Sequence, residues 1–337
     1  MPVIKAPQEF NVEDLFIDLR TVTGTPLYLK CEGFNFAGSV KLKAATEMVE
    51  AAERDGLVGP DCVLVESSSG NLGIALAMVA ADKGLRFVCV TDPRCNTASM
   101  RLMRSLGAEV VVIGEQDANG GYLESRIRYV RDLCAADDRY VWLNQYANPG
   151  NWRAHYRHTA PAIERNFPGL EVLFVGAGTT GTLMGCARYF KERGAPVTIV
   201  AVDAVGSVTF DHYNGPHGTA SDVPERRMVP GLGTSVRPEL VDESWVDDVV
   251  HVPETDTIRA CHGLAARGFL FGGSTGTVVS GAARWLQEKY PGEEPVALAV
   301  APDLGERYLD SIYEEGWLRE HFGPLDLPDR PHWSTHP

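Results

Sequence analysis

The chain has 337 residues, 44% hydrophobic and 23% charged, an ordinary composition for a folded protein of two domains or one large one. A formal net charge of −14 argues against nucleic acid and against anionic membranes as main partners. No apolar run approaches the ~18 residues of a membrane span, and seven scattered cysteines without a CxxC pair indicate reduced cytoplasmic thiols, with neither a disulfide framework nor a metal site.

The first distinctive segment is Asn35-Phe36-Ala37-Gly38-Ser39-Val40-Lys41, which precedes a helix expected over residues 44–54. Taken alone, a lysine after a Gly-Ser turn is most simply a surface residue.

From residue 62 onward, short β-branched runs alternate with alanine-rich helical stretches. This order predicts an α/β fold of parallel sheets with helices on both faces. Strands are expected over 62–66, 86–91, 109–113, 140–143, 171–175, 198–203 and 296–301, and helices over 72–83, 98–106, 121–133 and 182–193. Turns rich in glycine, serine and threonine precede the helices, where ligands bind in open α/β sheets.

The turn after the first of these strands carries Ser68, Ser69, Gly70 and Asn71. Its hydroxyl and N–H groups can hold a carboxylate, and the asparagine can present an amide to a polar ring substituent. Serine and asparagine also cap helices, which is the simpler alternative. A single cap does not need three serines, a glycine and an asparagine in one turn.

A second turn, Gly176-Ala177-Gly178-Thr179-Thr180-Gly181-Thr182, lies between a strand and a helix. With Asp203 about 20 residues further on, it matches the dinucleotide fingerprint. A helix N-terminus binds any phosphate, however. The three threonine hydroxyls suit a terminal phosphate dianion better than a pyrophosphate.

The last third of the chain contains a long glycine- and proline-rich loop expected over 211–237. A Gly272-Gly273-Ser274-Thr275-Gly276-Thr277 run precedes a helix expected over 278–289. The proline-containing tail, 324–337, is predicted to be disordered. The domains expected are a smaller α/β domain of residues 44–150 and a larger one of residues 1–43 plus 151–323.

The early lysine, the S-S-G-N turn, the G-T-T-G-T turn and the late G-G-S-T-G, in that order, resemble the cysteine synthase and cystathionine β-synthase family. These are pyridoxal 5′-phosphate (PLP) enzymes of the tryptophan-synthase-β fold, also called fold type II. The resemblance runs from about Thr23 to Trp317 and includes Thr23-Gly24-Thr25-Pro26-Leu27, Asn144-Gln145-Tyr146-Ala147-Asn148 and Pro302-Asp303. It implies two parallel-sheet α/β domains, a mobile smaller domain and a cytoplasmic homodimer.

The resemblance also implies roles for particular residues. Lys41 would form the Schiff base with PLP and move the Cα proton, Asn71 would bond the ring 3′-oxygen, and Ser274 would face the pyridine nitrogen. The cofactor phosphate would be held by Gly178, Thr179, Thr180, Gly181 and Thr182. The substrate carboxylate would be held by Ser68, Ser69, Gly70 and Gln145.

Three segments, residues 70–78, 117–123 and 202–208, resemble a narrower group within that family. Its members join O-phospho-L-serine to the amino group of L-glutamate, on the way to 2,3-diaminopropionate for siderophores or peptide antibiotics. Arg126 is then the predicted partner of the glutamate carboxylates. The alternative is a solvated helix arginine like its neighbours Arg128 and Arg131.

Three other functions stay open. A cysteine synthase or cystathionine β-synthase would use O-acetylserine, O-phosphoserine or serine with a sulfur nucleophile. A nicotinamide dehydrogenase would leave Lys41 and Ser274 unexplained. An inactive relative has one supporting feature, since the family usually has Asp-Arg where this chain has Leu42-Lys43. That departure also makes Lys43 an alternative PLP-bearing residue, although the spacing from Gly38-Ser39 favours Lys41.

Overall fold

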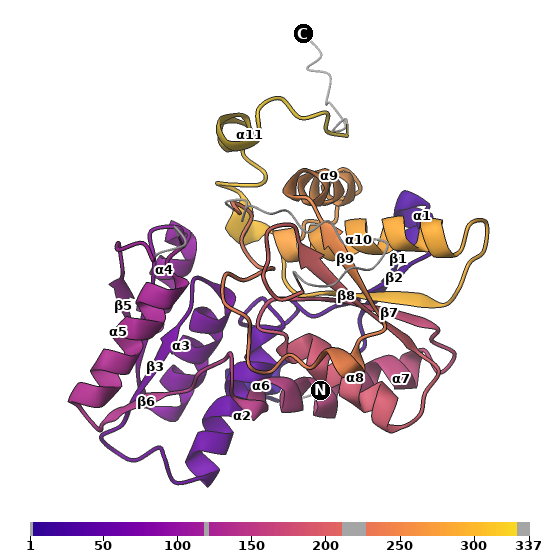
Figure 1. The fold of residues 1–337 in the computed structure, drawn as a ribbon. Helices are drawn as coiled ribbons and strands as arrows, with labels where there is room; N and C mark the ends of the chain where they lie inside the picture. The colour runs from indigo at the N-terminus through magenta and orange to yellow at the C-terminus, as the bar shows by residue number, and fades with distance from the viewer. Residues whose placement is uncertain (1–2, 118–120, 211–226, 329–337) are drawn as a thin grey trace.

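The computed structural model describes residues 3–117, 121–210 and 227–328, which form two mainly parallel sheets, as predicted (Figure 1). The smaller sheet has the order β5-β4-β3-β6 and the larger one β1-β2-β10-β7-β8-β9. Among the strands of the described residues, only the β1–β2 pair is antiparallel. The strands are β1 (Phe16–Asp18), β2 (Tyr28–Cys31), β3 (Val63–Ser67), β4 (Arg86–Thr91), β5 (Glu109–Val112), β6 (Tyr140–Trp142), β7 (Val172–Gly176), β8 (Thr198–Ala204), β9 (Asp248–Val252) and β10 (Ala297–Ala301).

Helices cover both faces of the smaller sheet. Leu64 and Phe87 point to one face, where they pack with residues of α2 and α3. Val65 and Val88, one residue further along each strand, pack with Val130 of α5 on the other face. This alternation follows from the period of two in a β-strand. The helices are α2 (Lys41–Arg54), α3 (Asn71–Lys83), α4 (Thr97–Ser105) and α5 (Leu123–Ala136).

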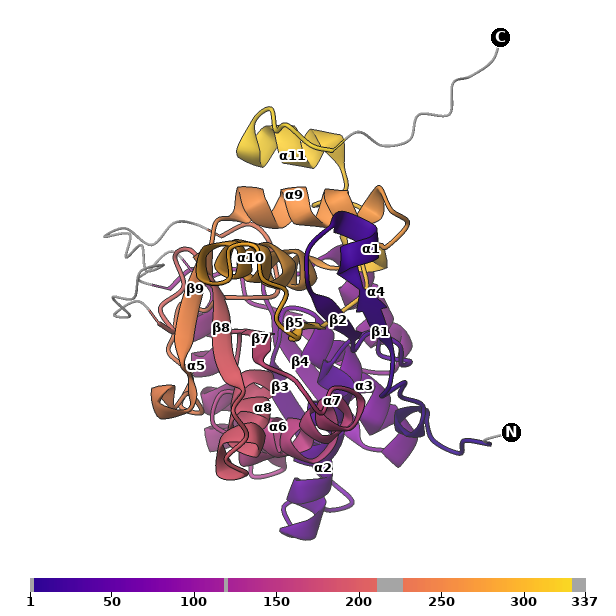
Figure 2. The same ribbon diagram turned by 90° about the vertical axis from the view of Figure 1, so that its right-hand side faces the viewer.

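The larger sheet is built in the same way. Phe174 and Val200 pack with α10, whereas Leu173 and Ile199 pack with α7 and α8. Figure 2 shows α9 and α10 on one side of this sheet and α6, α7 and α8 on the other, with α11 outermost beyond α9. These helices are α6 (Pro149–Ala154), α7 (Ala160–Asn166), α8 (Gly181–Glu192), α9 (Glu254–Ala265), α10 (Gly273–Lys289) and α11 (Glu315–Phe322), with α1 (Leu19–Thr23) at the sheet edge.

All seven predicted strands are present to within one residue at each end, but three helix starts were predicted wrongly. Helix α2 begins at Lys41, not at 44, because Val40 already has helical dihedral angles. Helix α5 begins at Leu123, not at 121, because Asp117 holds the Gly121 N–H outside the helix.

Helix α10 begins at Gly273, so the late glycine-rich run lies inside its first turns and not before it. A Cβ on Gly276 would overlap Cys261 of α9. Glycine is therefore kept within the helix by close packing between two helices.

Two predicted irregular segments are only partly described. Residues 227–237 of the long loop have no helix or strand, and residues 211–226 lie outside the described part of the chain. In the C-terminal tail, Leu325 and Leu327 pack against the cluster that contains Leu318, while 329–337 lie outside the described residues. None of the described helices is long and apolar enough to cross a membrane.

Candidate active site

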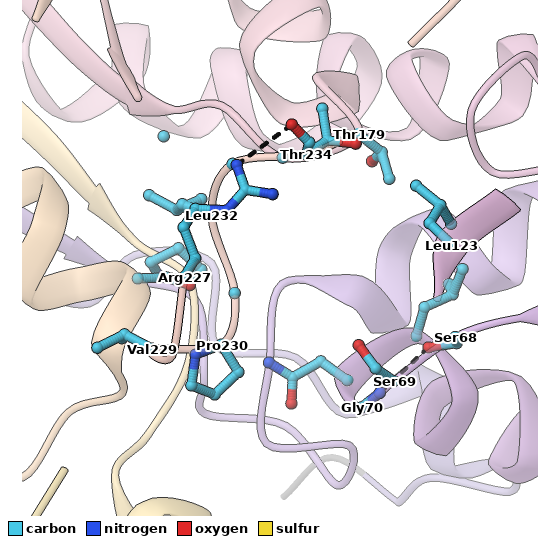
Figure 3. A pocket seen from close by; sticks show the side chains of 18 of the residues that line it. Ser68, Ser69, Gly70, Leu123, Thr179, Arg227, Val229, Pro230, Leu232 and Thr234 are labelled. Atoms are coloured by element: carbon cyan, nitrogen blue, oxygen red, sulfur yellow. Dashed lines mark hydrogen bonds between the residues drawn. The ribbon is translucent and has the colours of Figure 1, made fainter. Parts of the chain in front are cut away.

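A cavity of about 680 Å³ lies where the carboxyl ends of strands from both sheets converge. In Figure 3, the loop that carries Arg227 and Leu232 faces the Ser68–Gly70 turn across this space. All thirteen residues predicted for the site line the cavity: Lys41, Ser68, Ser69, Gly70, Asn71, Arg126, Gln145, Gly178, Thr179, Thr180, Gly181, Thr182 and Ser274. The fold therefore gathers into one place motifs that are far apart in the sequence.

Lys41 is the first residue of α2. The start of this helix is anchored by the preceding residue, because the Val40 N–H donates to the Pro302 carbonyl at 2.7 Å. Burial lowers the pKa of Lys41 to about 8, and the nearby Asp303 carboxylate opposes this shift. A lysine with a lowered pKa supplies the neutral amine that attacks a carbonyl carbon.

Lys43 lies two residues further along α2 and is directed away from the cavity. Its Nζ donates to Glu13 Oε2 at 2.7 Å, Glu32 Oε1 at 3.0 Å and Thr159 Oγ1 at 3.2 Å. Burial would lower the pKa of Lys43, but the two carboxylates outweigh burial and raise it. A charged, fully engaged ammonium cannot act as a nucleophile, so the geometry favours Lys41. Leu42, the other departure from the family pattern, is buried in the core of the smaller sheet.

The turn between β7 and α8 has the features of a phosphate site. Thr180 has a left-handed φ of 64°, an unfavourable conformation for a β-branched residue. Its buried Oγ1 has no hydrogen-bond partner among the described residues. Thr179 Oγ1 accepts from Asn151 Nδ2 at 3.0 Å. A phosphate at the N-terminus of α8 would satisfy the orphaned hydroxyl and the first N–H groups of the helix.

Asp203, the acid of the dinucleotide fingerprint, is fully buried within β8. Its Oδ1 accepts from the Ala204 N–H at 2.9 Å, and it is absent from the described lining of the cavity. The match to the fingerprint therefore lacks the ribose-binding carboxylate that a nicotinamide dehydrogenase needs.

Asn71 is held in one orientation by two charged residues that were not predicted as site residues. Arg307 Nη1 donates to Asn71 Oδ1 at 2.6 Å, and Asn71 Nδ2 donates to Asp303 Oδ2 at 2.8 Å. Arg307 also donates to the Ala37 carbonyl at 2.5 Å. The amide oxygen is therefore engaged by Arg307, and the amide nitrogen, which also lies 3.5 Å from the Tyr308 hydroxyl, is directed toward acceptors.

The serine turn makes a helix-capping type of contact and also lines the cavity. Ser68 Oγ accepts from the Gly73 N–H, in the first turn of α3, at 3.0 Å. Two hydrogen bonds hold Gln145 in place: its side-chain Nε2 donates to the Ser67 carbonyl at 2.8 Å, and its backbone N–H donates to Glu66 Oε2 at 3.0 Å. Burial raises the pKa of Glu66 to about 7 although three N–H groups donate to it.

Ser274 is the second residue of α10 and is buried at the cavity wall. A Cβ on Gly231 would collide with the Ser274 hydroxyl, and Gly231 has a φ of 123° that other residues rarely adopt. The loop can approach this serine only because residue 231 is glycine.

Arg126 is buried, which makes the solvated alternative wrong. Its Nε lies 3.4 Å from Asp92 Oδ2, and Nε and Nη1 have no hydrogen-bond partner among the described residues. Arg128 on the same helix is exposed and pairs with Glu115. A buried guanidinium with unused donors at a cavity wall is suited to an anionic ligand.

Two more arginines that the sequence did not predict line the same cavity. Arg94 stacks over the Tyr122 ring at 4.7 Å. Arg227 Nη1 donates to the carbonyls of Gly206 and Thr234, each at 3.2 Å (Figure 3). Arg94 follows the carboxyl end of β4, a position where ligand-binding residues are common in α/β sheets, so the sequence could have indicated it. No local sequence pattern indicates Arg227.

The electrostatics of the cavity are opposite to those of the chain as a whole. Its described lining carries four cationic residues and one acid, namely Lys41, Arg94, Arg126, Arg227 and Asp92, in a chain of net charge −14. The cavity is therefore built for small molecules with several negative groups.

Comparison with known proteins agrees with this chemistry. Residues 16–303 match the family model described as "Pyridoxal-phosphate dependent enzyme". The chain is 40% identical to N-(2-amino-2-carboxyethyl)-L-glutamate synthase of Ralstonia nicotianae, covering 87% of this chain and 83% of that protein. It is 39% identical to the protein of the same name from Cupriavidus metallidurans, covering 90% and 87%.

Solved structures show the same fold. O-ureido-L-serine synthase matches with a TM-score of 0.79 and 29% identity, over 95% of this chain and 96% of that one. A hydrogen sulfide-producing enzyme from Fusobacterium nucleatum matches with a TM-score of 0.80 and 24% identity, over 91% and 100%.

Proposed function

The chain belongs to the family of pyridoxal-phosphate-dependent enzymes, and we propose that it joins O-phospho-L-serine to the amino nitrogen of L-glutamate. The products are N-(2-amino-2-carboxyethyl)-L-glutamate and phosphate. Two relatives at about 40% identity over most of the chain carry the corresponding name. The observation that carries the proposal is the buried Arg126, whose unused N–H groups lie at the wall of a cavity with an excess of arginine.

Both substrates match this charge pattern. O-phosphoserine has a phosphate and a carboxylate, and glutamate has two carboxylates. Guanidinium groups bind carboxylates and phosphates through paired N–H donors. A sulfide nucleophile would need none of these donors, so three arginines at the cavity favour an acidic second substrate.

The residues present fit the cofactor. Lys41 would hold it covalently, and the 178–182 turn would hold its phosphate, because Thr180 has a buried hydroxyl that lacks a partner. Asn71 would donate to the ring 3′-oxygen, and the Ser274 hydroxyl would lie beside the pyridine nitrogen. When bound, PLP withdraws electrons from the α-carbon of an amino acid, so that the Cα proton and the Cβ substituent can leave.

The protein groups then handle protons and orientation. Lys41 Nζ, neutral at pH values near and above 8, takes the proton from Cα and returns it after the glutamate nitrogen has bonded to Cβ. The C–O bond breaks and the phosphate leaves with the bonding electron pair. The C–N bond to glutamate then forms, and the proton that the amine loses balances the charge of the released phosphate. Ser274 presents a hydroxyl and not a carboxylate, so it leaves the pyridine nitrogen largely unprotonated. That arrangement favours β-elimination over transamination.

Substrate binding would close the site. Ser68, Ser69, Gly70 and Gln145 would hold the carboxylate of O-phosphoserine, and Arg126 would bind a carboxylate of glutamate. Closure would move the smaller domain, residues 44–150, toward the larger one, residues 1–43 plus 151–323, and would exclude water. The proposal includes a cytoplasmic homodimer that supplies 2,3-diaminopropionate for siderophore or peptide-antibiotic biosynthesis.

Product analysis with isotopically labelled glutamate tests the proposal. PLP-loaded protein is incubated with O-phospho-L-serine and [¹⁵N]glutamate, and the products are separated by mass. The proposal predicts one new amino acid that retains the ¹⁵N label and the whole glutamate carbon skeleton. Formation of pyruvate and ammonia alone, with glutamate unchanged, would contradict it.

A further inference from the structure

A chain of hydrogen bonds runs from Lys43, behind the cavity, to Thr182 at its wall. Lys43 Nζ lies 3.2 Å from Thr159 Oγ1, and Thr159 Oγ1 lies 3.0 Å from His155 Nδ1. His155 Nε2 lies 3.2 Å from Thr182 Oγ1. His155 and Thr159 are fully buried, so water does not compete for these bonds.

The donor and acceptor properties of these four groups favour one direction for this series of hydrogen bonds, from Lys43 toward Thr182. An ammonium group is only a donor, so Thr159 Oγ1 must accept from Lys43. The Thr159 hydroxyl proton is then directed to His155 Nδ1, which accepts it. A neutral imidazole with a bare Nδ1 carries its proton on Nε2 and donates it to Thr182 Oγ1. Thr182, having accepted, has its own hydroxyl proton left for the cavity.

The reverse direction leaves a buried donor unsatisfied. If Thr182 donated to His155 Nε2, His155 would donate from Nδ1 to Thr159. The Thr159 proton would then have no acceptor, because Lys43 cannot accept. An unpaired buried hydroxyl costs about 1–3 kcal/mol, which corresponds to a roughly 5- to 150-fold preference for the first direction.

Lys43 can act as the first donor of the hydrogen-bond chain because neighbouring carboxylates stabilise its positive charge. Glu32 lies 2.8 Å from Lys43 and 2.9 Å from Lys30, and Glu13 lies 2.7 Å from Lys43. Burial, together with the Lys43 charge, lowers the pKa of His155 to about 3, so its ring stays neutral. His155–Thr159 is also one turn of π-helix, a local distortion that is frequent at functional sites.

We propose that His155 is a positioning residue which, held as the Nε2–H tautomer by Lys43 and Thr159, makes the Thr182 hydroxyl a donor to the cofactor phosphate. The inference rests on the proposed function in one respect, since it places that phosphate at the 178–182 turn. A phosphate dianion offers only acceptors, so a hydroxyl committed to donating favours it. Lys43, which replaces the arginine usual in the family, thereby influences the proposed phosphate site through Thr159, His155 and Thr182, without lining the cavity.

The tautomer can be measured without cofactor or activity. In ¹⁵N-labelled apo-protein at pH 7, ring-nitrogen NMR shifts distinguish a protonated Nε2 from a protonated Nδ1. His262 is an internal reference, because its Nε2 lies 2.8 Å from the Ile312 carbonyl, which only accepts. We expect His155 Nε2 to show the protonated shift, as His262 does, and Thr159→Val to weaken this preference. An Nδ1–H tautomer or an imidazolium at His155 would overturn the inference.

Affinity measurements separate this inference from the phosphate site itself. Titration of apo-protein by absorbance should give an affinity for PLP about 10-fold or more weaker in His155→Phe, with the affinity for pyridoxal unchanged. His262→Phe, a buried histidine away from the cavity, should leave both affinities unchanged. If His155→Phe does not fold, Thr159→Val takes its place.

Thr182→Val completes the design. If it weakens PLP binding and the His155 and Thr159 variants do not, the hydrogen-bond chain is wrong and the phosphate site stands. If Thr182→Val binds PLP as tightly as the unchanged protein, the phosphate is not held at this hydroxyl and the inference falls, whereas the phosphate site at the 178–182 turn is tested separately through Thr180.

Discussion

Arg126 Nε lies 3.4 Å from Asp92 Oδ2, and both side chains are buried at the wall of one cavity. The contact is too long for a strong paired salt bridge, and Nη1 of the arginine has no partner among the described residues. This arrangement holds the guanidinium in place while leaving donors for a ligand carboxylate.

Arg126→Ala should therefore raise the KM for glutamate by about 10- to 100-fold, the effect of losing a charge-assisted hydrogen bond. The KM for O-phosphoserine should change much less. Steady-state kinetics with each substrate varied in turn measure both values. Arg128→Ala removes an exposed arginine from the same helix and is the matched control. Equal effects of Arg126→Ala on the two KM values would rule out the glutamate role.

Cofactor capture should depend on pH through Lys41. Burial lowers its pKa to about 8, so the reactive neutral amine prevails above that pH and is lost as the pH falls through it. The rate at which apo-protein captures PLP, followed by absorbance, should rise with a midpoint near pH 8. A midpoint near 10.5, the ordinary lysine value, would show that burial does not tune this amine.

Asp303→Asn should shift that midpoint to lower pH. The Asp303 carboxylate opposes the effect of burial on Lys41, and its removal takes away a charge that stabilises the ammonium form. The same change loosens Asn71, which donates to Asp303 at 2.8 Å. The pH profile of PLP capture is compared between the two proteins. A midpoint that stays in place or rises would mean that the two residues do not interact electrostatically.

Borohydride reduction should locate the cofactor on Lys41. Peptide mass mapping of reduced, PLP-loaded protein is expected to find the pyridoxyl group there and none on Lys43, which is charged and bonded to Glu13 and Glu32. Lys43→Met should still yield the Lys41 adduct if it folds. A pyridoxyl group on Lys43 in the unchanged protein would overturn the assignment.

Thr180→Gly should stabilise the apo-protein while weakening its hold on PLP. Glycine relieves a left-handed φ of 64°, which costs a β-branched residue about 1–2 kcal/mol, but it removes a hydroxyl at the phosphate turn. Urea unfolding and PLP titration measure the two effects. Thr179→Gly, at a position without positive φ, should destabilise the protein. A Thr180→Gly protein that is less stable and binds PLP normally would contradict this account of the turn.

Much of this architecture is visible in the sequence because its signals are local. Alternation of strands and helices predicts the parallel sheets, and the turns at strand ends mark Asn71 and Thr180 as candidate ligand-binding positions. Lys41, taken alone, is indistinguishable from a surface lysine. Resemblance to a family then narrows their roles. The strands missed are β1, β2 and β9. With three and four residues, β1 and β2 are too short to show a period, whereas β9 is followed closely by α9 and was overlooked.

The rest depends on contacts between distant segments. Arg227 reaches the cavity because a loop without periodicity folds back over it, and Asn71 is oriented by Arg307, 236 residues away. In the sequence, Lys43 is only a departure from the residue usual in the family. In the structure, its contacts with Glu13, Glu32 and Thr159 make it the first donor of a buried hydrogen-bond chain. No pattern along the chain brings these groups together.

The most direct measurement is sustained phosphate release from O-phospho-L-serine by PLP-loaded protein, with L-glutamate or sulfide as the only added nucleophile. Our account predicts many turnovers with glutamate and little release with sulfide. Turnover with sulfide alone would make the protein a cysteine synthase and would remove the glutamate role assigned to Arg126.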